Sequence, residues 1–390
     1  MSSVRCTSPV PVASARLWQF DALRGLMLVL MTLTHVPTRL TEALGQPFGF
    51  VSAAFGFVFI SGLLVGRVQG RRRHTHGLAA VRASLWRRAG LVYACHLGLV
   101  AVLFWALPLT GIGVEVGPIA GMRWFFDSDP GAAIVGATML IHQPGLLDIL
   151  PMYVIFLLLS APMLACRARA GWAGPLALSV ALWLLAQTGL PGMAYEQFVF
   201  DNGLPIPRAA LGTFNLLAWQ LVWFGGLLLG AAQADGWQIR PGRWPRSLII
   251  VAGTVALTAF AWRHGAGMPT YSDQPVWATL FDKWHMGPLR LLNAVALAIV
   301  LMRFGPRGEA TWLWAPLRLL GRAALPVFMA HALVAMLVLG IAGDEVGDRS
   351  AAVDLAILAL TFSVLFMTAW IADRPAPPLT RSARSAASTA

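Results

Sequence analysis

Apolar stretches about as long as a membrane-spanning helix recur along the whole sequence, separated by short polar segments. A helix that crosses the hydrocarbon core of a bilayer needs about 20 predominantly apolar residues. Stretches near this length cover residues 18–38, 50–68, 86–107, 146–166, 174–190, 210–232, 247–263, 287–304, 323–342 and 352–372. The sequence therefore predicts an all-α fold, a polytopic transmembrane helical bundle of about ten spans.

The scarcity of charged residues excludes a soluble protein. Only 12% of the 390 residues are charged, whereas a soluble domain carries about 25%. A net charge of +12 would suggest a nucleic-acid partner for a soluble protein. Here the basic residues gather in short segments between apolar stretches, which is the positive-inside pattern of membrane proteins. We expect the lipid bilayer as a partner and no nucleic acid, and the sequence leaves the oligomeric state open.

Basic residues also orient the spans, because cytoplasmic loops carry an excess of Lys and Arg. With the N-terminus in the cytoplasm, cytoplasmic segments hold 21 of the 29 Lys and Arg residues and exterior segments hold seven. We therefore expect an inner-membrane protein with both termini in the cytoplasm. The expected division is a cytoplasmic N-terminal segment at 1–17, an integral membrane domain at 18–372 and a disordered cytoplasmic tail at 373–390.

The first span contains three ionisable residues, Asp21, Arg24 and His35. Each charge held centrally in a membrane costs about 2.5–3.5 kcal/mol on insertion scales. At about 100° per residue the three side chains share one helix face, with about 16 Å along the axis between Arg24 and His35. We predict that this face borders a polar cavity and carries the catalytic residues. The alternative is an interfacial Asp21–Arg24 salt bridge with a helix-end histidine.

Two features follow at the cytoplasmic end of the second span. Gly62 and Gly66 form a small-xxx-small pattern, which permits close helix packing. A cluster of arginines comes next, among them Arg67, Arg87 and Arg88. The cluster either orients the protein in the membrane or binds the phosphates of a donor substrate.

Polar residues also gather at the exterior ends of later spans, where they are candidates for substrate binding. They are His142, Gln143, Asp148, Asn215, Trp219, Gln220, Lys283 and Arg290. Helix capping is an alternative role for Asp148, and an interfacial aromatic belt is one for Trp219. His96 and His331 lie in the middles of spans, and we expect both to be structural.

Familiar cofactor signatures are missing from the sequence. We find no H-x-x-x-H or H-E-x-x-H spacing, no G-x-S-x-G elbow, no P-loop and no dinucleotide fingerprint. The three cysteines are too few and too scattered for a disulfide framework or a metal cluster. We therefore expect neither a metal site nor a permanently bound cofactor.

These motifs resemble the OpgC family of bacterial membrane proteins, over a region from about residue 17 to residue 370. The likeness rests on Phe20-Asp21-x-x-Arg24-Gly25 with His35-Val36-Pro37, Gly49-Phe50 with Phe57-Val58-Phe59-x-Ser61-Gly62, His142-Gln143-Pro144 with Leu147-Asp148-x-Leu150-Pro151, Phe214-Asn215-x-Leu217-Ala218-Trp219-Gln220 and Gly287-Pro288-Leu289-Arg290. The Arg24 and His35 spacing is also similar, more distantly, to the acyltransferase type 3 superfamily.

The resemblance implies transfer of an acyl group, succinyl in the name-giving case, from a cytoplasmic acyl-CoA to hydroxyls of periplasmic glucans. The family's histidine and arginine of the first span correspond to His35 and Arg24. One departure is Phe55, at a position where we expect an acidic residue in many members.

The chemistry fits these residues, since a hydroxyl that attacks a thioester needs a base that titrates near neutrality, and histidine is such a base. A transporter or flippase for an anionic or glycan substrate is the alternative, because buried charges also form relays. A non-catalytic scaffold would leave the polar face of the first span unexplained.

Overall fold

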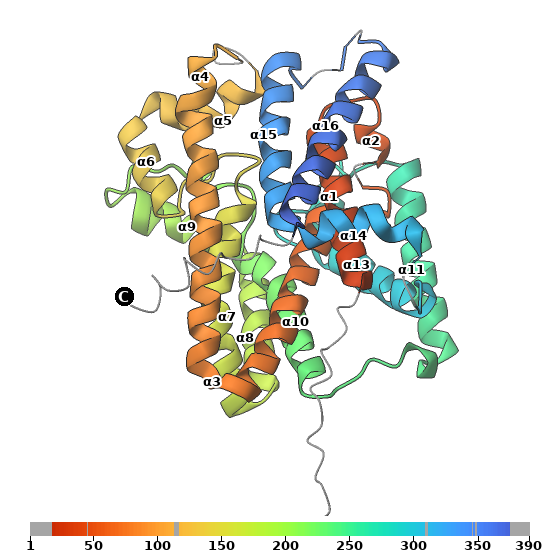
Figure 1. Cartoon of the computed structure of the whole chain (residues 1–390). Helices are drawn as coiled ribbons and strands as arrows, with labels where there is room; N and C mark the ends of the chain where they lie inside the picture. Colours follow the sequence, from red (N-terminus) through yellow and green to blue (C-terminus); the bar gives the residue numbers. More distant parts are fainter. Residues whose placement is uncertain are drawn as a thin grey trace, which may run out of the picture.

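All regular secondary structure in the described part of the chain is helical, which confirms the all-α prediction. The computed structural model describes residues 18–44, 46–112, 117–308, 311–344, 346–347 and 349–374 (Figure 1). The expected N-terminal segment at 1–17, and all but the first two residues of the expected tail at 373–390, lie outside the described residues.

The longer helices fall on the apolar stretches. They are α1 (Trp18–His35), α3 (Ala53–Ala101), α7 (Ile149–Ala170), α8 (Ala173–Ala186), α10 (Leu216–Ala234), α11 (Arg246–Gly265), α13 (Pro288–Phe304), α15 (Ala324–Ala342) and α16 (Ala351–Ala372). Shorter helices connect them: α2 (Thr41–Leu44), η1 (Val102–Ala106), α4 (Leu107–Leu109), α5 (Pro118–Ser128), α6 (Pro130–Thr138), α9 (Leu190–Tyr195), η2 (Glu196–Phe200), η3 (Arg208–Leu211), η4 (Pro241–Arg243), α12 (Pro275–Leu280), η5 (Trp312–Trp314) and α14 (Ala315–Arg322).

Six helices of the described chain are long and apolar enough to cross a membrane, or seven if the bent pair formed by α8 and the α9–η2 segment is one span. The segments of this pair meet at an angle of 76°. Outward-facing side chains on α11 and α16 are large and apolar, with Leu257 68% exposed and Leu360 69% exposed. Such surfaces suit lipid rather than water, so this is a membrane protein. The number of about ten spans stays a prediction.

The helix α3 is a hairpin of two arms rather than one straight rod. Gly77 has a φ of 76°, in the left-handed region that favours glycine, and it breaks the helix there. The Gln69 side-chain amide donates to the Ser84 hydroxyl at 3.2 Å. In a straight helix those residues would lie about 22 Å apart along the axis. The predicted second and third spans are therefore these two arms, and the expected loop between them is helical almost throughout.

Glycines set the closest helix contacts. A Cβ atom on Gly62 or Gly66 would lie 2.3 Å and 2.0 Å from the backbone carbonyl oxygens of Trp223 and Leu227 on α10. Packing therefore accounts for this small-xxx-small pattern. The same device brings α1 against α14, where a Cβ on Gly25 would lie 1.9 Å from the Leu317 carbonyl oxygen.

The helices that surround α1 decide where its polar residues point. In Figure 1, α7 and α10 stand beside the arms of α3, α8 packs against α10 and α7, and α11 and α13 form a separate pair. Helix α1 contacts α3, α14 and α15. The polar face of α1 is therefore turned toward protein.

Candidate active site

A cavity of about 200 Å³ lies at the C-terminal end of α1. We call it the histidine cavity, because His35 lines it. Thr34 beside His35 also lines the cavity, and the other polar lining residues come from later parts of the chain: Gln46, Ser52, Asp148, Thr213 and Lys283. A hollow in which a few polar groups converge from separate segments is typical of a binding site for a small molecule.

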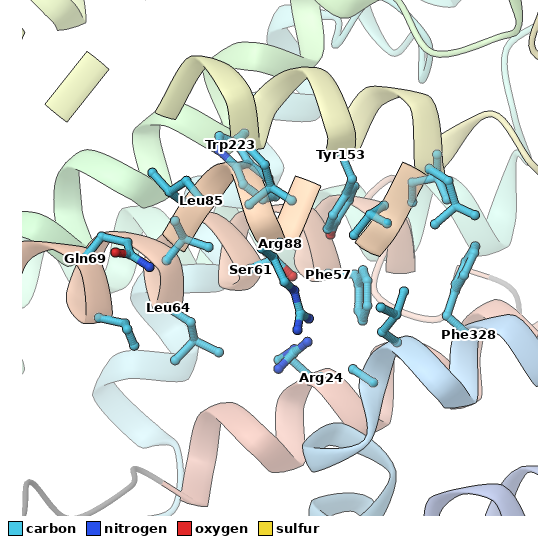
Figure 2. A pocket seen from close by; sticks show the side chains of 18 of the residues that line it. Arg24, Phe57, Ser61, Leu64, Gln69, Leu85, Arg88, Tyr153, Trp223 and Phe328 are labelled. Atoms are coloured by element: carbon cyan, nitrogen blue, oxygen red, sulfur yellow. The ribbon is translucent and has the colours of Figure 1, made fainter. Parts of the chain in front are cut away.

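A second cavity, of about 320 Å³, lies further along α1 toward the Gly77 end of the α3 hairpin (Figure 2). We call it the arginine cavity. Arg24 from α1 and Arg88 from the second arm of α3 point toward one another across it, while Gln69 and Ser84 line it near the hairpin end. Two guanidinium groups that face one space attract an anion such as a phosphate.

The two cavities are adjacent. Ile149 of α7 and Phe328 of α15 line both of them, so the spaces meet at these two apolar side chains. Arg24 in one cavity and His35 in the other are eleven positions apart on α1, which corresponds to about 16 Å of helix. A ligand that reaches from the arginines to the histidine would have to pass these two side chains. Asp21, the third polar residue predicted on this face, is buried and lines neither cavity.

His35 is in direct contact with His331, which sequence analysis had placed among the structural residues. The Nδ1 atom of His35 lies 3.0 Å from the Nε2 atom of His331. On its other side, the Nδ1 atom of His331 lies 3.2 Å from the Thr32 hydroxyl. No local sequence pattern points to this pair, because the two histidines are 296 positions apart.

Asp148 is buried in the histidine cavity and stands at the N-cap position of α7, but its side chain makes no capping hydrogen bond to that helix. Its carboxylate accepts hydrogen bonds from the Thr213 hydroxyl at 2.5 Å and the Thr213 backbone N–H at 3.2 Å. The contact ties the entrance of α7 to the segment that precedes α10. The capping hydrogen bond considered for Asp148 is therefore not formed, and its carboxylate binds Thr213 beside the cavity instead.

Lys283 brings an ammonium group to the same cavity. Burial, and then the charge of Arg290, lower its pKa to about 8. The ammonium also lies 4.1 Å from the centroid of the Trp284 ring. At neutral pH the group remains mostly charged, so it can donate a hydrogen bond to an anionic group in this cavity.

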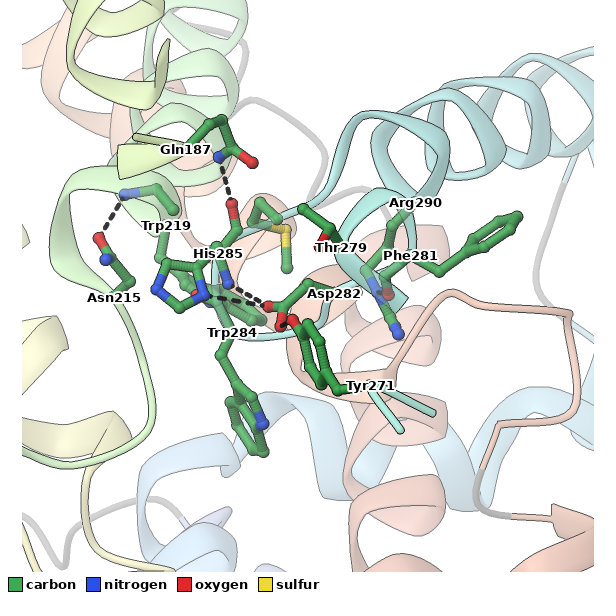
Figure 3. A network of polar contacts seen from close by, with 12 residues as sticks. Gln187, Asn215, Trp219, Tyr271, Thr279, Phe281, Asp282, Trp284, His285 and Arg290 are labelled. Carbon is green, nitrogen blue, oxygen red and sulfur yellow. Dashed lines mark hydrogen bonds and ion pairs between the residues drawn. The ribbon is translucent and has the colours of Figure 1, made fainter. Parts of the chain in front are cut away.

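Side chains from neighbouring helices hold the loop that carries Lys283 by hydrogen bonds to its backbone (Figure 3). The Trp219 indole donates to the Trp284 carbonyl oxygen at 3.1 Å, and the Gln187 amide donates to the His285 carbonyl oxygen at 2.6 Å. Asp282 accepts from the Tyr271 hydroxyl at 2.6 Å. Burial by itself would raise the pKa of Asp282, but hydrogen bonds from His285 and Tyr271 hold it at about 2.

Three residues that the sequence suggested for substrate binding are buried and line neither named cavity. Trp219 holds the Lys283 loop, as just described. Gln220 exchanges hydrogen bonds with Ser179, receiving from its hydroxyl at 2.6 Å. Arg290 donates to the carbonyl oxygens of Phe281 and Phe50. Their polar groups thus tie helices and loops together around the site.

Two of the three remaining candidates line a third cavity, of about 470 Å³, which shares Thr213 and Phe214 with the histidine cavity. Gln143 and Asn215 line it. Asn215 also caps α10 by accepting from the Ala218 N–H, while His142 is buried with its Nδ1 atom 3.0 Å from the Ala210 carbonyl oxygen. We call this space the outer cavity.

The arginines of the predicted cluster lie in different environments. Arg88 lines the arginine cavity, whereas its neighbour Arg87 is exposed and does not. Arg67 donates to the Gln233 side chain at 3.1 Å. A further arginine that the sequence did not single out, Arg322, joins Arg24 and Arg88 around an adjoining cavity of about 350 Å³.

A family model described as OpgC protein matches residues 16–376, which is nearly the whole chain. The chain belongs to the OpgC family. Membership of the OpgC family indicates a glucan-modifying transferase. No match was found among curated proteins or among solved structures. Phe55, the departure from the expected family pattern, does not line the histidine cavity, although Ala53 and Ala54 beside it do.

Proposed function

We propose that this OpgC-family protein is a membrane-bound O-acyltransferase. It moves an acyl group, such as succinyl, from a cytoplasmic acyl-CoA to hydroxyls of a periplasmic glucan or related glycan. The protein resides in the bacterial inner membrane with both termini in the cytoplasm. The observation that carries the proposal is the pair of adjacent cavities along α1, one with facing arginines and one with His35.

Arg24 and Arg88 bind the phosphates of the donor, because guanidinium groups form paired hydrogen bonds with phosphate oxygens. The thioester end of the donor extends past Ile149 and Phe328 to the histidine cavity. The acceptor glycan approaches through the outer cavity, which adjoins the histidine cavity at Thr213 and Phe214. Acyl-CoA is therefore a co-substrate rather than a resident cofactor.

Acyl transfer then follows from the position of His35. The acceptor hydroxyl gives its proton to the Nε2 atom of His35 while its oxygen attacks the thioester carbon. The oxyanion of the tetrahedral intermediate is stabilised by the Lys283 ammonium. The C–S bond breaks, and the departing thiolate takes the proton back from His35. An ester and a free thiol result, and the base returns to its starting state.

Transport is the second candidate, and the bent α8 and α9–η2 pair favours it, since broken helices occur at transporter binding sites. One assay separates the two functions. Purified protein is incubated in detergent with radiolabelled acyl-CoA and a periplasmic glucan, and the glucan is then analysed for label. A transferase yields covalently labelled glucan, whereas a transporter yields none.

A further inference from the structure

The hydrogen bonds around Thr32, His331 and His35 determine where each proton lies. The Thr32 hydroxyl donates its only hydrogen to the Leu28 carbonyl oxygen at 2.8 Å. Its oxygen therefore accepts from the His331 Nδ1 atom, 3.2 Å away, and this nitrogen must carry a hydrogen. A neutral imidazole has one donor and one acceptor nitrogen, so the Nε2 atom of His331 is an acceptor.

The same assignment of donors and acceptors extends to His35. The Nε2 atom of His331 lies 3.0 Å from the Nδ1 atom of His35, and two acceptors do not bind each other. His35 must therefore hold its hydrogen on Nδ1 and its lone pair on Nε2. His331 is fully buried, with the ring of Phe328 centred 5.9 Å away, and such surroundings favour a neutral imidazole.

We propose that His331, oriented by Thr32, is a positioning residue that holds His35 in the tautomer whose Nε2 atom is unprotonated. This inference rests on the proposed role of His35 as the base. In the opposite tautomer, Nε2 would already carry a hydrogen and would not accept the proton of the acceptor hydroxyl. His331 also accepts from the Nδ1–H of the imidazolium that forms during the reaction, so it stabilises the positive charge there.

The variants that test this role differ in one hydrogen-bonding atom. The side chain of His331→Gln places its Oε1 atom the same number of bonds from the backbone as Nε2, so it keeps an acceptor for His35. His331→Phe fills a similar volume and offers no acceptor. A second pair of variants tests the hydrogen bond between Thr32 and His331. Thr32→Ser keeps the hydroxyl, and Thr32→Val removes it at nearly constant size.

We expect His331→Phe to lose about 10²–10⁴-fold in kcat, the usual contribution of a general base, with KM unchanged for both substrates. His331→Gln should recover most of that loss, and Thr32→Val should be slower than Thr32→Ser. A purely structural histidine would lower stability in both His331 variants without separating their kcat values. Equal kcat values for His331→Phe, His331→Gln and the wild type would overturn the proposal.

Nitrogen-15 NMR of histidine-labelled protein tests the tautomer without any turnover. The His35 signals, assigned by their loss in His35→Gln, should show a protonated Nδ1 and an unprotonated Nε2. A protonated Nε2 in the wild type would overturn the positioning role, whatever the activity. An unprotonated Nε2 in a protein that transfers no acyl group would support the positioning role and would refute the proposed function instead.

Discussion

Replacing Arg88 by Gln should weaken binding of the acyl-CoA donor without changing the chemical step. Arg88 lines the arginine cavity opposite Arg24 (Figure 2), and its side chain is exposed. A hydrogen bond to a charged group contributes about 1.5–3 kcal/mol. For an exposed guanidinium we take the lower end, about 1.5 kcal/mol, which corresponds to about a tenfold increase in the apparent KM for the donor.

The chain offers a matched control for this experiment. Arg87 precedes Arg88 on the same helix and has the same charge, but about 100° of helical rotation turns it away from the cavity. Initial rates are measured at varied donor concentration for Arg88→Gln, Arg87→Gln and the wild type. Only Arg88→Gln should raise KM, and kcat should stay constant. Equal KM values for the two variants would refute the assignment of Arg88 to donor binding. The arginine cluster would then only orient the protein in the membrane.

Three further predictions concern stability and topology. Gly66→Ala should lower the free energy of unfolding by about 1–3 kcal/mol, because its Cβ would lie 2.0 Å from the Leu227 carbonyl oxygen. Thermal melting checks this loss. The control Gly253→Ala should show none, because a Cβ there would have no neighbouring atom within 4 Å. The pKa of Asp282 is held at about 2, below its unfolded value of about 3.9, so the stability that it contributes is present above pH 4 and is lost as the pH falls toward 2. Asp282→Asn should flatten this part of the pH-stability curve, and an unchanged curve would contradict the assignment. Reporter fusions should score cytoplasmic after Arg72 and exterior after Asp129, and the reverse pattern would contradict the predicted orientation.

The helices were predictable from the sequence because lipid selects long apolar stretches directly. Gly62 and Gly66 were also predictable, since only small residues permit such close helix packing. The extent of the hairpin at Gly77 was not, because its polar residues continue the helix on both arms instead of forming a loop. Helix ends of this kind are set by tertiary contacts such as Gln69 with Ser84 rather than by composition.

Side-chain roles were harder to predict than helices. Trp219, Gln220 and Arg290 have the chemistry of ligand-binding residues, yet the structure uses them to bind loops and helices. Conversely, His331 looked structural because it lies in an apolar stretch. Its contact with His35 depends on how α1 packs against α15, and no local pattern encodes that packing.

The most direct test of the account is the rate of acyl transfer after replacement of His35. Purified His35→Ala protein is incubated with labelled acyl-CoA and glucan, with its folding checked by gel filtration and thermal melting. We predict a loss of about 10²–10⁴-fold in kcat, and a similar loss for His35→Gln, which keeps a hydrogen-bonding group but does not transfer protons. His96→Gln, a change in a buried histidine away from both cavities, should retain transfer. Near wild-type transfer by well-folded His35→Ala would contradict the assignment of His35 as the base.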